Sequence, residues 1–329
     1  MKDLTNLKTF IIDSDNPKEV DDAISLELVS NNIKYIWIHI SYPCKLFEYE
    51  SNEDINARNN CASLYLIDKY IPMLTSRIID IANLKQNKIS ETISARIELN
   101  ENGSIKAYEL VEAFIKPNYE LTYEDANELL DLEPGEEYEL IVLNNLLKKS
   151  FYFRKSKGAI MFDDPYSKIS LKSNNISFEK VYKTEAHQLI SEAMILMGFV
   201  ISDYLRKMKI ASPFRSQKIN CDAKDILERN SKSVIKYSIL KQYIGKSYIS
   251  LKPGKHETLG LETYVQATSP LRRYLDLLIQ RQLYLSLNKL EILSNNIVNE
   301  IIEKIKLKNI ENNNIIKEDK NFFLKKYFN

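Results

Sequence analysis

The chain has 329 residues, of which 44% are hydrophobic and 28% are charged, and its formal net charge at pH 7 is +1. These values are typical of a folded globular protein with a sizeable core, and the length exceeds the usual size of one domain. The near-neutral charge excludes a uniformly basic nucleic-acid binder, although a basic groove can be balanced by acidic surface elsewhere.

Targeting signals and cysteine patterns are both absent. No run of 18 apolar residues occurs, and the N-terminus has neither an apolar h-region nor a small-residue cleavage site. These absences argue against a membrane span and against secretion. The widely spaced Cys44, Cys61 and Cys221 form no CxxC pair or zinc pattern, which is typical of buried thiols in a reducing compartment. We therefore expect a cytoplasmic protein without membrane contact.

The first third of the chain shows the patterns of β-strands. Short apolar runs and alternating segments are separated by turn signals rich in Asn and Gly. The expected strands are residues 9–12, 23–29, 35–40, 92–99 and 105–114, the last two forming a hairpin.

After Pro117 the hydrophobic period becomes helical. Thr122 and Asp125 resemble a capping box, which predicts a helix over residues 123–131. The run of three Asn from Asn312 is expected to interrupt the last helix. Strands first and helices later predict an α+β fold, strand-rich over 1–116 and helix-rich over 117–329 of a single domain. The other expected helices are 136–157, 183–209, 270–288 and 297–305.

The ten residues from Asp13 to Asp22 contain five carboxylates between two hydrophobic strands. Crowded like charges repel, so a cation is the usual means of neutralising them. Oxygen ligands without His or Cys nearby favour Mg²⁺ or Mn²⁺, which can activate water in phosphodiester cleavage. An EF-hand is a poor match because the turn Gly and the closing Glu are missing. An acidic surface loop remains the alternative for this segment alone.

A basic segment follows far along the chain. Thr268 or Ser269 can cap a helix that begins at Pro270, which suits the first helical turn. Arg272 and Arg273 then lie near the positive end of the helix dipole, where a guanidinium can grip a phosphate. The alternative is a solvated helix start that is paired with acidic neighbours.

No nucleophile motif accompanies the histidines. His39, His187 and His256 are far apart in sequence and lack a partner Ser or Cys, so we interpret all three as structural.

Taken in order, these segments resemble the ribonuclease II (RNB) family over residues 10 to about 285. The two strongest matches are Ile12-Asp13 with Glu19-Val20-Asp21-Asp22-Ala23, and Thr268-Ser269-Pro270-Leu271-Arg272-Arg273-Tyr274. Weaker matches lie between them, at Tyr65-Leu66, Gly158-Ala159-Ile160-Met161-Phe162-Asp163, Glu185-Ala186-His187, Glu192-Ala193 and Leu259-Gly260-Leu261.

The resemblance implies an RNB catalytic domain, with antiparallel strands and long helices around a central RNA channel. The implied activity is hydrolysis of single-stranded RNA from its 3′ end to nucleoside 5′-monophosphates. The implied cofactor is Mg²⁺, or Mn²⁺, with no organic cofactor, and we expect a monomer. By position, the metal-binding residues would be Asp13, Glu19, Asp21 and Asp22, the catalytic residues Asp21, Arg272 and Arg273, and the RNA contacts Tyr65, Tyr123, Phe162 and Glu192.

Two departures qualify these expectations. Glu19 stands where the family usually has Asp, and the nine residues before the first catalytic strand leave no room for cold-shock domains. The chain also ends near the point where an S1 domain would begin. We therefore expect a weaker grip on RNA, since such modules supply electrostatic affinity. The alternatives are an RNB-like RNA clamp without catalysis, and a DNA nuclease or other metal-dependent phosphodiesterase.

Overall fold

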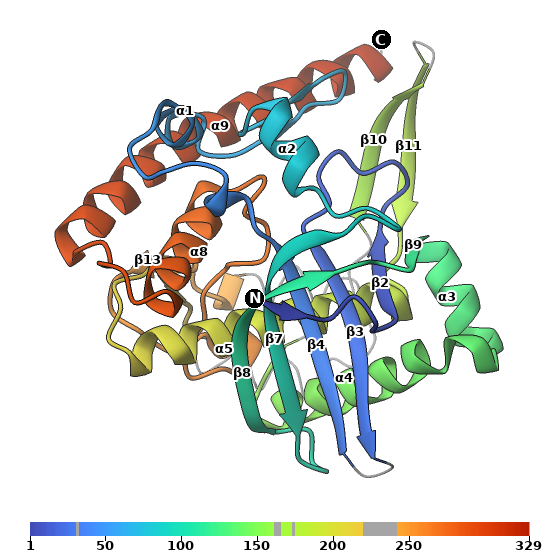
Figure 1. Ribbon diagram of the computed structural model, residues 1–329. Coiled ribbons are helices and arrows are strands. Elements are labelled where there is room, and N and C mark those ends of the chain that lie inside the picture. Colours follow the sequence, from blue (N-terminus) through green and yellow to red (C-terminus); the bar gives the residue numbers. More distant parts are fainter. Residues whose placement is uncertain (31–32, 161–165, 173–174, 220–241, 329) are drawn as a thin grey trace.

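The computed structural model describes residues 1–329 except 31–32, 161–165, 173–174, 220–241 and 329. Phe162 and Cys221 lie outside the described residues. The centre is a seven-stranded sheet in the order β1-β8-β7-β4-β3-β2-β9 (Figure 1). Its neighbours pair antiparallel except β1 with β8 and β2 with β9, which are parallel. The sheet strands are β1 (Lys2–Asp3), β2 (Thr9–Asp13), β3 (Asp22–Ser30), β4 (Ile33–Ser41), β7 (Ser90–Leu99), β8 (Ile105–Ile115) and β9 (Tyr119–Thr122).

Three two-stranded sheets lie outside this sheet in the described part of the chain. They are formed by β5 (Leu64–Tyr65) with β6 (Tyr70–Ile71), β10 (Tyr166–Lys172) with β11 (Asn175–Val181), and β12 (Phe214–Ser216) with β13 (Tyr248–Ser250). The helices are α1 (Asn52–Asn60), α2 (Ser76–Ala82), α3 (Tyr123–Leu132), α4 (Tyr138–Ser156), α5 (Glu185–Lys207), α8 (Tyr274–Leu287) and α9 (Asn295–Phe328), with 3₁₀ turns at Pro43–Lys45, Gly135–Glu137 and Glu257–Leu259.

Successive side chains of β4 point to opposite faces of the sheet, so the hydrophobic core is divided between the two faces. Ile36, Ile38 and Ile40 point to one face, where they join the large core formed with the helices, including α4 and α5. Trp37 points to the other face, into a smaller core with Leu84 and Ala113. Both faces of the central strands are therefore buried, which gives the strand ends that carry the polar cluster a rigid base.

The long helix α5 crosses this core. By length and hydropathy it could span a membrane, since an 18-residue window reaches a mean hydropathy of 1.3. Polar residues interrupt its apolar ones, so α5 contains no continuous run of 18 apolar residues that would indicate a span in the sequence. However, 67% of that window is buried inside the protein, as in the core helix of a globular fold. The hydropathy of α5 is thus accounted for by its packing.

Most expected elements are present within a few residues of their predicted bounds. The five strands over 9–12, 23–29, 35–40, 92–99 and 105–114 are confirmed as β2, β3, β4, β7 and β8. The capping box is confirmed as well, since Thr122 Oγ1 accepts a hydrogen bond from the Asp125 N–H and Asp125 accepts one from the Thr122 N–H.

Two helix predictions are wrong at one end. The helix expected from Pro270 begins only at Tyr274, and residues 270–273 form a turn before it. The last helix does not stop at the three asparagines but continues to Phe328. Asn312 is buried, and its Nδ2 donates a hydrogen bond to the Asn60 carbonyl, 3.0 Å away. This tertiary contact outweighs the modest helix propensity of Asn.

Candidate active site

The acidic loop (residues 13–22) connects β2 to β3 at one end of the sheet. β2 and β3 pair only at Thr9 with Ser25 and at Phe10 with Ile24, so the chain leaves the sheet before it returns at Asp22. Asn16 has φ +51°, a left-handed conformation that Asn tolerates better than most residues. The loop folds back there and brings both ends of the acidic segment to the same edge of the sheet.

Asp21 is the most deeply buried carboxylate of the loop, at 3% exposure. Its Oδ1 accepts hydrogen bonds from the Leu271 N–H and the Ser41 hydroxyl, both at 3.0 Å. Its Oδ2 is buried and accepts no hydrogen bond from the part of the chain that the structure describes. The Nε of Arg272 lies 3.7 Å from this oxygen, too far for a hydrogen bond. An unpartnered buried carboxylate oxygen is costly, and it marks a position that a cation can fill.

The carboxyl groups around Asp21 also have displaced pKa values. Burial raises the pKa of Asp21 to about 7, against the opposing hydrogen bond from Leu271. Burial, with repulsion from Asp13 and Asp21, raises the pKa of Asp22 to about 8. Burial raises the pKa of Asp13 as well. Without a cation, the cluster therefore holds protons near neutral pH.

These residues suit a hard divalent ion. The described residues contain no group of three His, Cys, Asp or Glu side chains already arranged around one point. Mg²⁺ does not require such a cage, because it usually keeps several waters and takes one or two carboxylates together with substrate phosphates. The unpartnered Asp21 Oδ2 and the adjacent Asp22 carboxyl meet that requirement.

Glu19, the departure from the family pattern, is buried and already hydrogen-bonded. Its Oε1 accepts from the Ser63 hydroxyl at 2.7 Å, and its Oε2 accepts from the Tyr65 hydroxyl. Each carboxylate oxygen has a second lone pair, so these contacts leave room for a cation. Ser63 and Tyr65 therefore orient Glu19, and its role as a metal ligand stays a prediction.

The basic elbow (residues 268–273) packs against this loop through its backbone and presents two arginines in different ways. Arg272 is 42% exposed in its side chain, whereas Arg273 donates from both Nε and Nη2 to Asp276 Oδ2, at 3.0 and 2.6 Å. Asp276 also accepts the Ser269 N–H at 2.9 Å. These contacts of Asp276 stabilise the turn that precedes the helix start at Tyr274. Arg272 forms an ion pair with Asp21, whereas Arg273 forms one with Asp276.

Two cavities meet where the acidic loop and Arg272 lie side by side. The larger, of about 790 Å³, is lined by the predicted residues Asp13, Asp22, Tyr123, Glu192, Arg272 and Arg273 among others. The smaller, of about 340 Å³, is lined by the acidic loop with Tyr65 and Arg272. Asp13, Asp22 and Arg272 line both. The structure thus brings together every predicted site residue that lies within the described chain.

The remaining predicted RNA contacts are packed in distinct ways. The ring of Tyr123 stacks on His187 with 3.8 Å between centroids and an angle of 10° between their planes. Glu192 is buried, and its carboxylate accepts from the Ser150 hydroxyl and from two nitrogens of Arg154. Glu192 therefore joins α4 to α5 at the cavity wall, and its contact with RNA stays a prediction.

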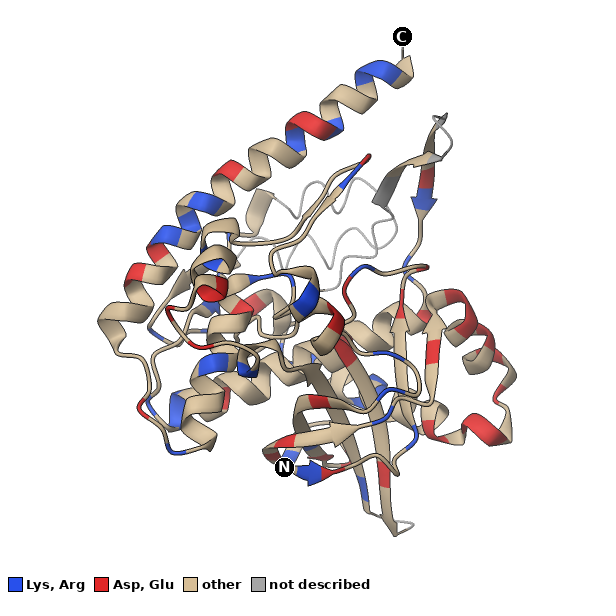
Figure 2. Ribbon diagram, turned by 45° about the horizontal axis from the view of Figure 1, so that its top comes forward, with Lys and Arg blue, Asp and Glu red and all other residues tan. Residues whose placement is uncertain are grey.

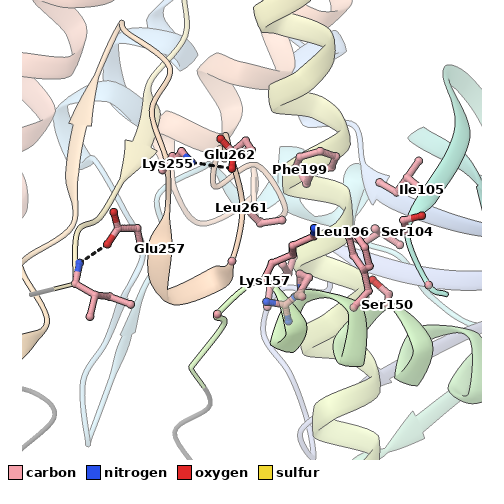
Figure 3. Close-up of a pocket in the computed structure, with 17 residues that line it drawn as sticks. Ser104, Ile105, Ser150, Lys157, Leu196, Phe199, Lys255, Glu257, Leu261 and Glu262 are labelled. Carbon is pink, nitrogen blue, oxygen red and sulfur yellow. Dashed lines mark hydrogen bonds and ion pairs between the residues drawn. The ribbon is translucent and has the colours of Figure 1, made fainter. Parts of the chain in front are cut away.

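A third cavity, of about 600 Å³, contains no predicted site residue. Figure 3 shows its lining, which mixes apolar side chains such as Leu196 and Phe199 with charged ones, and Lys255 and Glu262 form an ion pair at 3.0 Å. Arg154 and Ile195 line both this cavity and the larger one beside the acidic loop. The Arg154 side chain thus stands in the wall between them.

Sequence reasoning missed the residues that orient the carboxylates. Ser41 and Ser63 donate hydroxyls to Asp21 and Glu19, and Asp276 holds the elbow. No local pattern identifies the two serines, because their partners lie 20 and 44 positions away. Asp276 lies two positions beyond the Thr268–Tyr274 motif, and its role becomes clear only from the turn that it closes.

The charged residues are unevenly distributed over the molecule (Figure 2), although their total charge is near neutral. Figure 2 shows acidic residues gathered on α3 and the turn that follows it, whereas the elbow contributes Arg272 and Arg273 to the larger cavity. The sequence composition concealed this local separation of charge.

Comparisons with known proteins identify relatives of this chain in sequence and in fold. A relative named uncharacterized ribonuclease, from Synechocystis sp., is 33% identical over 286 residues, which cover 85% of this chain and 43% of the relative. The chain thus spans less than half of that relative's length.

Solved structures show the same fold. One is an active-site mutant of the Dss1 exoribonuclease from Candida glabrata, with a TM-score of 0.89 and 22% identity. The match covers 97% of this chain and 45% of the Dss1 chain. Mycoplasma genitalium RNase R in complex with ribose-methylated single-stranded RNA matches 98% of this chain and 57% of its own, with a TM-score of 0.84 and 19% identity. Yeast Ssd1, described as a pseudonuclease, matches 93% of this chain and 43% of its own, with a TM-score of 0.75 and 16% identity.

Residues 1–289, which are well over half of the chain, match the model of the RNB domain family. This match, together with the fold and the ordered motifs, shows that the chain belongs to the RNB domain family.

Proposed function

We propose that this protein is a metal-dependent exoribonuclease that hydrolyses single-stranded RNA from the 3′ end and releases nucleoside 5′-monophosphates. The observation that carries the proposal is the unpartnered, buried Oδ2 of Asp21, which lies 3.7 Å from the Nε of the half-exposed Arg272. A buried acid with a free oxygen beside an accessible guanidinium is suited to a cation and a phosphate together.

Asp21 and Asp22, with Asp13 and Glu19 beside them, would hold one or two Mg²⁺ or Mn²⁺ ions. When bound, such ions lower the pKa of a coordinated water and stabilise the leaving 3′-oxygen of the cleaved phosphodiester. The raised pKa values of Asp21 and Asp22 support this role, because a divalent ion can replace the protons that these groups otherwise hold.

The remaining chemistry belongs to the side chains. Arg272 would bind the scissile phosphate through two parallel N–H groups and stabilise the charge that develops on it. Tyr65 and Tyr123 would supply surfaces on which terminal bases stack, a contact that is typically ~1–3 kcal/mol per base and tolerant of sequence. The cavity of about 790 Å³ behind Arg272 gives the 3′-terminal nucleotide a place to lie.

The main rival is an RNA clamp without catalysis, since one structural neighbour is described as a pseudonuclease. In this chain Asp13, Asp21 and Asp22 are all present and partly or fully enclosed, and Arg272 lines the same cavities. Retention of the complete acidic set favours hydrolysis. A DNA nuclease is the second rival.

The test is a time course on 5′-labelled single-stranded RNA with Mg²⁺, with the wild type beside Asp21→Asn. We expect the wild type to shorten the RNA progressively, and the variant or EDTA to stop hydrolysis while RNA still binds. Asp15→Asn serves as the matched control, because Asp15 is an exposed carboxylate of the same loop whose loss should leave the rate unchanged.

The rivals give different results in the same assay. Wild-type protein that binds RNA but leaves it intact with either metal would support the clamp. A single-stranded DNA of the same sequence, hydrolysed as fast as the RNA, would favour the DNA nuclease, because an exoribonuclease is expected to select the 2′-hydroxyl.

A further inference from the structure

The C-terminal helix α9 (Asn295–Phe328) lies outside residues 1–289, which match the RNB family model. It crosses the top of the molecule in Figure 1 and contacts β5, the strand that carries Tyr65. We call residues 60–73, which include the β5–β6 hairpin, the hairpin segment. This segment has contacts with α9 on one side and with the candidate active site on the other.

Two polar side chains of α9 bind the backbone of the hairpin segment. Asn312 is 5% exposed and its Nδ2 donates to the Asn60 carbonyl at 3.0 Å. About two turns further along, Asp319 Oδ2 accepts the N–H of Ile67 at 2.9 Å. The Cys61 thiol adds a contact of 3.2 Å to Asn309 Oδ1. α9 therefore fastens both the start and the tip of the segment.

The other side of the hairpin segment reaches the candidate active site. The hydroxyls of Ser63 and Tyr65 donate to the two oxygens of Glu19. The Ser63 N–H also donates to the Arg272 carbonyl at 3.1 Å, while the Cys61 carbonyl accepts the Tyr274 N–H at 2.9 Å. The same segment thus orients an acid of the loop and supports the backbone of the elbow.

The segment needs external support because its own pairing is small. β5 and β6 contribute two residues each, and an isolated two-stranded hairpin is marginally stable at best in water. Tyr65 is also 46% exposed, so packing alone does not hold its ring in place. The Tyr65 ring contacts Tyr70 inside the hairpin, with 5.3 Å between ring centroids, and the hydrogen bonds from α9 hold the backbone of the segment from outside.

We propose that Asp319 and Asn312 are positioning residues: through the hairpin segment, α9 holds the Ser63 and Tyr65 hydroxyls on Glu19 and supports the backbone of Arg272. This inference rests on the proposed function for its catalytic consequence. Its structural part, the coupling of α9 to the hairpin segment, is independent of whether RNA is hydrolysed.

The experiment compares Asp319→Ala with Asp319→Asn and with the neighbouring control Glu318→Ala. Asn keeps a carbonyl oxygen that can accept the Ile67 N–H, so it should rescue the loss. Amide hydrogen exchange over residues 61–73 should become about tenfold faster in Asp319→Ala, the scale of one lost hydrogen bond to a charged group, and stay unchanged in the other two. Asn312→Ala should act in the same direction, with Asn313→Ala, an exposed asparagine, as its control.

The catalytic consequence is tested with the same variants on RNA. We expect Asp319→Ala to lower kcat about tenfold at an unchanged KM and to raise the Mg²⁺ concentration needed for half-maximal rate, because positioning residues of metal sites typically have effects of about 10–100-fold. In combination with Tyr65→Phe, the double variant should be no slower than the slower single variant, since both changes break the same connection. Thermal melting of each variant checks that the fold is retained.

The outcomes separate the two claims. Unchanged exchange over 61–73 in Asp319→Ala, or a kcat equal to that of Glu318→Ala, would overturn the positioning role. Fully additive effects of Asp319→Ala and Tyr65→Phe would also overturn it, because additivity indicates independent sites. If the wild type leaves RNA intact, the proposed function fails, and the exchange data alone decide whether α9 holds the hairpin segment.

Discussion

Arg272 and Arg273 are neighbours in sequence but differ in their surroundings. Arg272 reaches toward Asp21 with a half-exposed side chain, and Arg273 is occupied by a two-nitrogen contact with the buried Asp276. Of the five N–H donors of an arginine, Arg273 uses two on Asp276, and turning its guanidinium toward a phosphate would break that pairing. The structure therefore favours Arg272 for substrate and Arg273 for the architecture of the elbow.

Replacing Arg272 with Ala should affect catalysis and leave stability nearly unchanged. We expect kcat on RNA to fall about 10²–10³-fold, the scale seen when one donor to transition-state charge is lost. Arg272→Lys should recover only part of the rate, because Lys keeps the charge but not the planar fork. Steady-state kinetics with melting curves check both points.

Arg273→Ala is the contrasting change. It leaves the Asp276 carboxylate buried without its cation, so we expect a stability loss of roughly 3–5 kcal/mol in denaturant unfolding. If Arg273→Ala folds as stably as the wild type while Arg272→Ala does not, the assignment of roles is reversed.

At the scale of single residues, the sequence predicted which residues belong to the candidate site but not the hydrogen bonds that hold them in place. Asp13, Asp21, Asp22 and Arg272 were found because their density is unusual and their order resembles a known motif. Their partners Ser41 and Ser63, and the Leu271 N–H, are ordinary residues that become informative only when the fold places them beside a carboxylate.

At the scale of elements, α5 shows how packing overrides intrinsic preference. Gly198 sits within this helix, where Ala would normally be preferred by ~1 kcal/mol. A Cβ at that position would lie 2.5 Å from the backbone oxygen of Val265, closer than such atoms approach. The glycine lets the segment before the elbow run directly against α5.

Gly198→Ala should therefore destabilise the protein by ~1–3 kcal/mol, the usual cost of overpacking, despite the gain in helix propensity. The comparison is Gly135→Ala, where a Cβ meets nothing within 4 Å. Denaturant unfolding measures both variants. A Gly198→Ala protein that equals or exceeds the wild type in stability would contradict the close packing described here.

Element types were predictable, but two boundaries were not. The strands and the α3 cap follow from local patterns of period two and from a local hydrogen-bond motif. The start of α8 depends on Asp276 closing a turn, and the continuation of α9 past Asn312 depends on Asn60, 252 positions away. Local patterns contain neither constraint.

At the scale of the whole molecule, the acidic loop connects fold stability to pH and to metal. Burial raises the pKa of Asp21 to about 7 and of Asp22 to about 8, from an ordinary value of 3.8. The folded protein thus binds these protons more tightly than the unfolded chain does. Their stabilising contribution is full below the ordinary pKa and is lost as the pH rises through the folded-state values.

We expect the melting temperature of the metal-free protein to fall between about pH 4 and about pH 8, and Mg²⁺ to restore it near neutral pH by replacing the protons. An Asp21→Asn, Asp22→Asn double variant should show a flatter pH dependence and little response to Mg²⁺. Calorimetry or thermal fluorescence across this range checks the prediction. A melting temperature that rises steadily with pH in the absence of metal would contradict it.

The central claim is directional, metal-dependent removal of single nucleotides, and product order tests it most directly. The substrate is an oligoadenylate with one cytidine at its 3′ end, incubated with Mg²⁺ and sampled at early times by chromatography, with EDTA as the control. We predict that cytidine 5′-monophosphate appears first, that adenosine 5′-monophosphate follows, and that EDTA abolishes both. Adenosine 5′-monophosphate appearing before the cytidine product, short oligonucleotides in place of mononucleotides, or hydrolysis that persists in EDTA would contradict the account.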